Sequence, residues 1–227
     1  MTERASLNAL VVFQVGPIPI GLEVVTTWVI MAVLVGIAWF GTRRLSATQP
    51  SRFQIILEMV VGFLEDLIRD VMGAEPEVFL PLIGTLFLYI VTCNLSPLIP
   101  GVKPPTAHVE TTGALGLIVF FTVHSLGVRQ RGLLGYLRTY LEPTFIFLPL
   151  NILGEFTRTF ALMVRLAGNI MSHELTIAVV IGLAGLFVPI PFMALSILVG
   201  LVQAYIFTIL AAVFIGGAMG TINTNTP

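Results

Sequence analysis

The sequence predicts an all-α, polytopic membrane protein with a surface amphipathic helix and a long, tilted C-terminal helical hairpin. Hydrophobic residues make up 56% of the chain and charged residues 10%, whereas soluble domains carry about 25% charged residues. Several uncharged stretches are long enough to cross about 30 Å of hydrocarbon, and one further stretch is amphipathic. We expect residues 1–227 to form a single membrane domain. The net charge of −1 leaves no basic surface for nucleic acid.

The first span is expected at residues 24–42, an uncharged run with a tryptophan towards each end and a pair of arginines after it. The preceding residues 1–21 are interpreted as a retained N-terminal segment. Pro17 and Pro19 interrupt their apolar patch, and no small-residue cleavage pattern follows, so a signal peptide is not indicated.

Residues 53–72 form the expected surface helix. Most of the charged side chains fall on one face of this segment, which is too polar to cross a bilayer. The opposite face is apolar and holds Ile56, Met59, Val60, Phe63, Leu67 and Val71. The helix is expected to lie on the membrane surface, and docking on a soluble partner is the alternative.

Residues 78–128 are expected to form a helical hairpin. Two uncharged runs, 78–102 and 111–128, flank a polar connection. Pro81 suits the first turn of a helix, where a missing N–H is tolerated. Cys93 is the only cysteine, which excludes an internal disulfide, and we expect it to be a packing residue.

Residues 143–221 are expected to form the tilted hairpin. The apolar run from 145 to 186 is longer than one perpendicular span, and a proline turn joins it to a last helix over 192–221. Gln203 is the one large polar side chain in that last helix, and its simplest interpretation is an interhelical hydrogen bond. Beside the surface helix, we count four crossing segments.

A stripe of polar residues runs along the first helix of this hairpin. Its members, at helical spacing, are Glu155, Arg158, Arg165, Asn169 and His173. An arginine at the centre of a membrane helix costs about 2.5–3.5 kcal/mol on insertion scales, so a compensating role is expected. An ion pathway is one explanation, and a buried ion pair is the other.

Small residues recur beside the stripe. Gly154, Ala161 and Gly168 are seven residues apart and share a face, on which another backbone could approach closely. Ordinary tight packing is the alternative explanation. Met163 is expected to face lipid.

Loop charges predict the orientation of the chain. Three arginines fall within residues 43–52 and three within 129–138, whereas 103–110 holds only Lys103. The positive-inside rule then places the first two connections in the cytoplasm, the N-terminus outside and the C-terminus in the cytoplasm.

The segment Arg165-Leu-Ala-Gly-Asn169, followed by Glu174, resembles the R-L-x-G-N-(x)4-E signature of subunit a of F-type rotary ATP synthases. The similarity covers nearly the whole chain, from about residue 24 to about residue 220. It includes the last-helix motif Gln203-Ala-Tyr-Ile-Phe207. The arginine motif is specific, and its combination with Gln203 is more specific still.

The resemblance implies a non-catalytic stator subunit without a cofactor, in the bacterial inner membrane. Its implied partners are the rotating c-subunit ring, b-type peripheral stalk subunits and the lipid bilayer. Two half-channels would lead ions to and from a carboxylate on the ring, so that the flow of protons, or of sodium ions, drives ATP synthesis.

The resemblance also implies roles for individual residues. Arg165 matches the essential arginine that faces the ring carboxylate. The other residues assigned to ion translocation are Glu174, Gln203, Asn169, Glu155 and His173. Among them, His173 departs from the family pattern, because many members have a small residue there. Ala161 and Gly168 would contact the rotor.

Two other functions remain open at the level of sequence. An independent ion channel or secondary transporter would also explain an intramembrane arginine, although we find no internal repeat of the transporter kind. A non-conducting membrane scaffold would hold Arg165 in a static ion pair.

Overall fold

The computed structural model describes residues 11–15, 18–43, 45–46, 50–73, 76–99, 102–141, 145–184 and 188–220. Its described residues form a helical body of six α-helices: α1 (Leu22–Thr42), α2 (Arg52–Met72), α3 (Pro76–Leu95), α4 (Val109–Leu141), α5 (Leu148–Ala184) and α6 (Pro189–Met219). Short 3₁₀ turns follow α3 and precede α4 and α5, at Ser96–Leu98, Pro105–Ala107 and Phe145–Phe147. The expected all-α membrane fold is confirmed for this body.

Five of these helices, all except α2, are long and apolar enough to cross a membrane. The described chain therefore has one more candidate span than the four crossing segments expected. α5 has 37 residues and is therefore about 55 Å long, so it fits about 30 Å of hydrocarbon only when steeply inclined.

A short antiparallel pair of strands precedes the first helix, which the sequence pattern did not indicate. β1 (Val11–Val15) pairs with β2 (Ile18–Gly21), with Val15 opposite Ile18 and an irregularity between Val11 and Phe13. The expected leader of residues 1–21 thus contains a hairpin, while residues 1–10 lie outside the described part of the chain.

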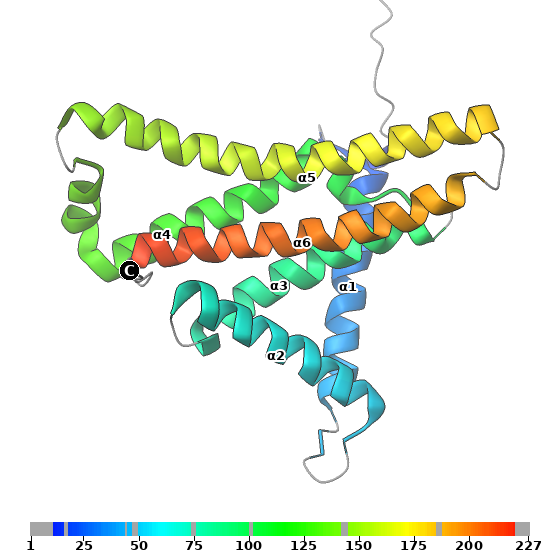
Figure 1. Ribbon diagram of the computed structural model, residues 1–227, viewed down its shortest axis with the longest axis horizontal. Helices are drawn as coiled ribbons and strands as arrows, with labels where there is room; N and C mark the ends of the chain where they lie inside the picture. Colours follow the sequence, from blue (N-terminus) through cyan, green and yellow to red (C-terminus); the bar gives the residue numbers. More distant parts are fainter. Residues whose placement is uncertain are drawn as a thin grey trace, which may run out of the picture.

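One local expectation in the central hairpin is wrong: Pro81 lies inside α3, because that helix already begins at Pro76. Residues 129–138, expected as a connection between spans, contain a break at Gly132 but are otherwise helical, and α4 runs on to Leu141. The helix changes direction at Gly132, whose φ of 70° is readily adopted only by glycine. In Figure 1 the segment after this kink turns up towards the start of α5.

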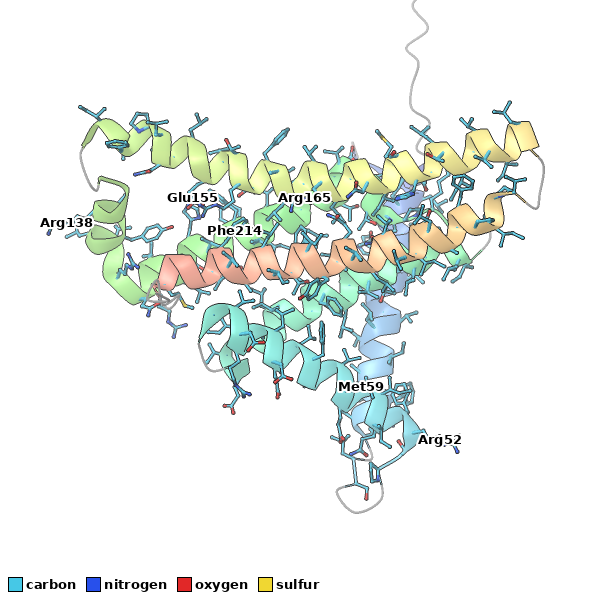
Figure 2. All side chains as sticks on the ribbon, in the orientation of Figure 1. Arg52, Met59, Arg138, Glu155, Arg165 and Phe214 are labelled. Atoms are coloured by element: carbon cyan, nitrogen blue, oxygen red, sulfur yellow. The ribbon has the colours of Figure 1, made fainter. Side chains whose placement is uncertain are left out.

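The surface helix α2 divides its apolar residues between two environments. Leu64, Leu67 and Ile68 are buried against the body, whereas Met59 is 68% exposed and Ile56 is 58% exposed. Figure 2 shows Met59 and Arg52 together at the end of the molecule that lies away from α5. Exposed apolar groups beside charged ones suit a helix that rests on a membrane or a partner.

The core of the body lies between α3, α4 and α6. It includes Ile83, Ile90 and Cys93 of α3 and Phe207 and Ile215 of α6, all of which are fully buried. The expectation that Cys93 is a packing residue is thereby confirmed.

α5 and α1 lie at the margins of this core (Figure 1). α5 runs alongside α6 and crosses α4, and it buries only the narrow face of Leu162, Leu166, Ala167 and Ile170. In α1, Ile30 is the only buried residue of the helix. Most of the side of α5 that faces away from the body is therefore uncovered.

Candidate functional site

Arg165 lies near the middle of α5 (Figure 2) and is exposed. Within the described residues, no group forms a hydrogen bond or an ion pair with its guanidinium. A static ion pair inside the described chain, which would have explained the arginine without a pathway, is therefore not present. The cation is available to a group from outside the chain.

The small residues of α5 lie on the same uncovered side as Arg165. Ala161 and Gly168 are exposed, and a Cβ added at Gly154 or Gly168 would meet no atom within 4 Å. These residues do not serve close packing within the described chain. Met163, by contrast, was wrongly expected to face lipid: its side chain fills the space above Gly113 and Gly116 of α4.

Asn169 and Gln203 join α5 to α6. Nδ2 of Asn169 donates a hydrogen bond to Oε1 of Gln203 at 2.8 Å, which confirms the expected interhelical bond of Gln203. Gln203 is only 3% exposed, and its Nε2 has no partner among the described groups. A buried amide donor left without an acceptor costs about 1–3 kcal/mol, so this N–H marks a place for water or for another polar group.

A second polar connection reaches α6 from the central hairpin. Nδ2 of Asn94 donates to the carbonyl of Gly200 at 2.9 Å, and Oγ1 of Thr106 donates to Oδ1 of Asn94 at 3.0 Å. All three residues are buried. The sequence alone gave Asn94 and Thr106 no role, because their contacts span 106 and 12 residues of sequence.

One polar cavity lies beside the N-terminal half of α5, and we call it the Glu155 cavity. It has a volume of about 460 Å³ and is lined by Glu155, Arg158, Asn151, Arg131 and Phe214, among others. Nη1 of Arg158 lies 3.4 Å from Oε1 of Glu155, and its guanidinium carbon lies 4.7 Å from the centre of the Phe214 ring. Figure 2 shows Glu155 and Phe214 from α5 and α6 in the same gap.

A second cavity, the Glu174 cavity, lies beside the C-terminal half of α5. It has a volume of about 490 Å³ and is lined by Glu174, Lys103, Asn94, Met193 and Ser196, among others. Lys103 and His108 lie within electrostatic range of the Glu174 carboxyl group. Lys103 and Ser196 were not among the expected site residues, because nothing in their local sequence distinguishes them from loop and helix-surface residues.

The expected polar stripe is therefore divided among different surroundings. Glu155 faces one cavity, Asn169 turns towards α6, and Arg165 is exposed between them. His173 is half-buried and lines none of the described cavities. Glu174, which is outside the stripe, lines the second cavity.

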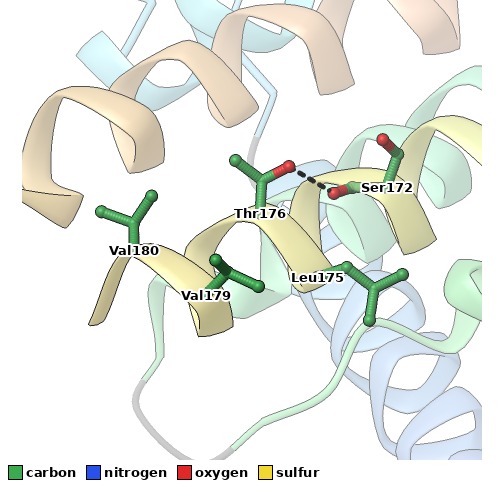
Figure 3. A pocket seen from close by; sticks show the side chains of 5 residues that line it. All are labelled: Ser172, Leu175, Thr176, Val179 and Val180. Carbon is green, nitrogen blue, oxygen red and sulfur yellow. Dashed lines mark hydrogen bonds between the residues drawn. The ribbon is translucent and has the colours of Figure 1, made fainter. Parts of the chain in front are cut away.

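The uncovered face of α5 continues past Arg165 to a shallow depression of about 320 Å³. Ser172, Leu175, Thr176, Val179 and Val180 line it (Figure 3). Oγ1 of Thr176 donates to the Ser172 carbonyl at 2.8 Å, so this hydroxyl is satisfied within the helix. Within the described residues, no group of three or more His, Cys, Asp or Glu side chains could hold a metal ion.

Comparison with known proteins identifies the family. The family model of the ATP synthase A chain matches residues 24–216. The chain is 56% identical to ATP synthase subunit a 2 of Bradyrhizobium sp. (strain BTAi1 / ATCC BAA-1182), over 97% of this chain and 98% of that protein. It is 46% identical to ATP synthase subunit a 1 of Chlorobaculum parvum, again over 97% and 98% of the two chains. Through a match that covers most of its length, the chain, a multi-pass membrane protein, belongs to the ATP synthase A chain family.

Proposed function

We propose that this chain is the ion-translocating stator subunit of an F-type ATP synthase. It provides two half-channels and a fixed arginine beside a rotating c-subunit ring, and it catalyses no ATP chemistry itself. The observation that carries the proposal is the placement of two cavities along α5, one on each side of Arg165.

The spacing of the cavities supports a divided pathway. The Glu155 cavity reaches Arg158, and the Glu174 cavity begins at Met171. Arg165 therefore lies about 10 Å along the helix from each of them. Between them, α5 is closed against the body by Leu162, Leu166 and Ile170. An ion that enters one cavity needs a carrier to reach the other, and a carboxylate on a passing ring helix would serve.

Arg165 supplies the electrostatic step in this scheme. Its guanidinium carries a fixed positive charge. A ring carboxylate that comes opposite this cation is stabilised in its ionised form and releases its ion. The exposed cation also repels ions that would pass directly from one cavity to the other.

The uncovered face of α5 provides the surface for the ring. Ala161 and Gly168 present no bulk there, so a ring helix can pass close to Arg165. Asn169 and Gln203 lie at the α6 side of this surface, and the unsatisfied Nε2 of Gln203 would bind water of the pathway. His173 follows Asn169 by one turn and extends this polar edge.

The loop arginines support an arrangement with the N-terminus outside and the C-terminus in the cytoplasm of a bacterial inner membrane. The Glu155 cavity, which includes Arg131, then opens on the cytoplasmic side, and the Glu174 cavity on the outer side. The peripheral stalk, of b-type subunits, would hold the subunit still against the ring. The transported ion is a proton or a sodium ion.

Cysteine accessibility in the assembled complex tests the two half-channels. In a Cys93→Ala background, Glu155→Cys should react with silver ions or a small thiosulfonate added from the cytoplasmic side, and Glu174→Cys with reagent added from outside. Leu166→Cys is the matched control on the same helix; Leu166 is fully buried and should stay unlabelled from either side.

Labelling from each side of the membrane is measured in inverted and in right-side-out vesicles. Each measurement is made with and without prior blocking of the cysteines that are accessible from the opposite side. If both cysteines were labelled from the same side, the two-channel arrangement would be wrong. If neither were labelled in the assembled complex, the two cavities would have no part in ion transport.

A further inference from the structure

A third cavity lies away from Arg165, between the isolated helix α1 and the central hairpin. This α1 groove has a volume of about 560 Å³. Its walls include Thr27 and Val35 of α1, Leu82 and Tyr89 of α3, and Glu110 and Ile118 of α4. None of the residues assigned above to ion translocation lines it.

The groove exists because α1 is barely attached to the body along its length. Ile30 is the only buried residue of α1, and the groove runs along the helix from Val24 to Val35. That distance corresponds to about 16 Å. All three wall helices are long and apolar enough to cross a membrane, so the groove opens towards hydrocarbon and not towards bulk water.

The groove is amphipathic from end to end. Glu110 and Thr111 begin α4 at the end where α1 also begins, and Tyr89 and Thr27 lie near that end. At the opposite end the walls are Val35, Leu82 and Ile118, which are wholly apolar. A ligand that fits must carry a polar group at one end and an extended apolar part behind it.

The charged residues at the polar end of the groove determine which polar group of a ligand would bind there. Glu110 is exposed and has no ion-pair partner within the described residues. The neighbouring acid, Glu23, is already engaged, since its Oε1 lies 3.5 Å from Nε2 of His108. A free carboxylate beside an occupied Glu23–His108 pair favours a cationic group over an anionic one.

A single extended acyl chain is much thinner than a helix, and it suits both the length and the volume of the groove.

We infer that the α1 groove is a lipid-binding site, which takes one acyl chain of an amine-bearing phospholipid such as phosphatidylethanolamine and pairs its ammonium group with Glu110. The lipid belongs to the leaflet that holds the start of α1. It fills the space between α1 and the body and so holds a weakly attached helix in place. This inference does not depend on the ion pathway proposed above.

The test uses the assembled complex in vesicles with two probes that carry the same photoactivatable acyl chain, one with an ethanolamine and one with a glycerol headgroup. The ethanolamine probe should cross-link to wall residues of the groove in preference to the glycerol probe. Glu110→Gln retains the shape of the side chain and should reduce this preference by about fivefold, the upper range for an exposed ion pair.

A second variant addresses the acyl chain. Ala114 is exposed and lines the groove, so Ala114→Trp should fill it and remove cross-links of both probes there. Ala32→Trp is the matched control, because Ala32 is exposed on α1 without lining the groove. Yields are normalised to assembled complex.

Three results would overturn the inference. Cross-links spread evenly over all exposed helices would indicate ordinary boundary lipid only. Equal yields in wild type and Ala114→Trp would mean that no chain occupies the groove. If the groove walls cross-linked to a helix of another subunit and not to the lipid probes, the groove would be a protein interface.

Discussion

The last two helices resemble each other in composition but differ in whether their small residues are buried. Both α5 and α6 are long, apolar and interrupted by small residues. In α6 these residues are buried: Gly200, Ala204 and Ala211 lie against the rest of the chain, and a Cβ added at Gly200 would come 3.0 Å from Cβ of Asn94. In α5, Gly154 and Gly168 have open space where a Cβ would be.

This difference shows that small residues at helical spacing do not by themselves indicate whether they pack within the chain or leave a surface open. In α6 they let the chain pack on itself and bring the Gly200 carbonyl within reach of Asn94. In α5 they leave a surface beside an unpaired arginine that nothing in the described chain covers. We interpret the first face as structural and the second as reserved for the rotor.

The largest effect is expected at the arginine. Arg165→Ala should abolish ion-driven ATP synthesis and ATP-driven pumping while the complex still assembles, because the described chain makes no bond to the guanidinium. Arg165→Lys should fail as well, since an ammonium group is more tightly hydrated and lacks the planar fork of arginine. Both activities are measured in inverted vesicles and normalised to complex. Near-normal synthesis by either variant would contradict the role proposed for this face.

The comparison itself is tested by one substitution on each helix. Gly200→Leu should destabilise the subunit by about 1–3 kcal/mol or more through overpacking against Asn94, which lowers the amount of assembled complex. Gly168→Leu should leave insertion and assembly nearly normal yet sharply lower synthesis, because only the rotor would meet the new side chain.

Equal loss of assembly in both variants would mean that the α5 face packs against something static, and the rotor contact would be abandoned. Gly182→Leu is a useful control for bulk alone. Gly182 is also exposed on α5 with no atom within 4 Å of an added Cβ, but it lies more than four turns beyond Arg165.

An intermediate effect is expected at Glu174. Glu174→Ala removes a carboxylate that lines the Glu174 cavity and is not tightly packed. Ion flux should therefore fall partially, and assembly should be retained. Glu174→Asp keeps the charge and should restore most of the flux. Passive ion flux through the complex stripped of its soluble sector is the measurement. Unchanged flux in Glu174→Ala would remove this residue from the pathway.

The smallest effect is expected at Phe214 on α6. Phe214→Leu retains the apolar contact but removes the ring beneath the Arg158 guanidinium, a contact worth about 0.5–1 kcal/mol at an exposed site. The thermal midpoint of the purified complex should fall slightly and synthesis should change little. A large loss of synthesis would instead assign Arg158 a direct part in the pathway.

Some features of this protein follow from its sequence alone. Uncharged runs determine the membrane class, because unpaired charges are costly in hydrocarbon. The family was indicated by the resemblance of the segment from Arg165 to Asn169, with Glu174, to a known signature. The single interhelical bond expected of Gln203 was also correct. These properties depend on composition and on helical periodicity, which are local.

Other features were decided only by tertiary structure. The side of α5 that is covered depends on where α4 and α6 lie, so sequence reasoning placed Met163 in lipid although it packs on Gly113 and Gly116. The pairing of Asn94 with the Gly200 carbonyl joins residues 106 apart, and the expected connection at 129–138 is helical on both sides of a break at Gly132. Helical periodicity defines the faces of a helix, but only packing against distant segments determines which face is buried and which stays open.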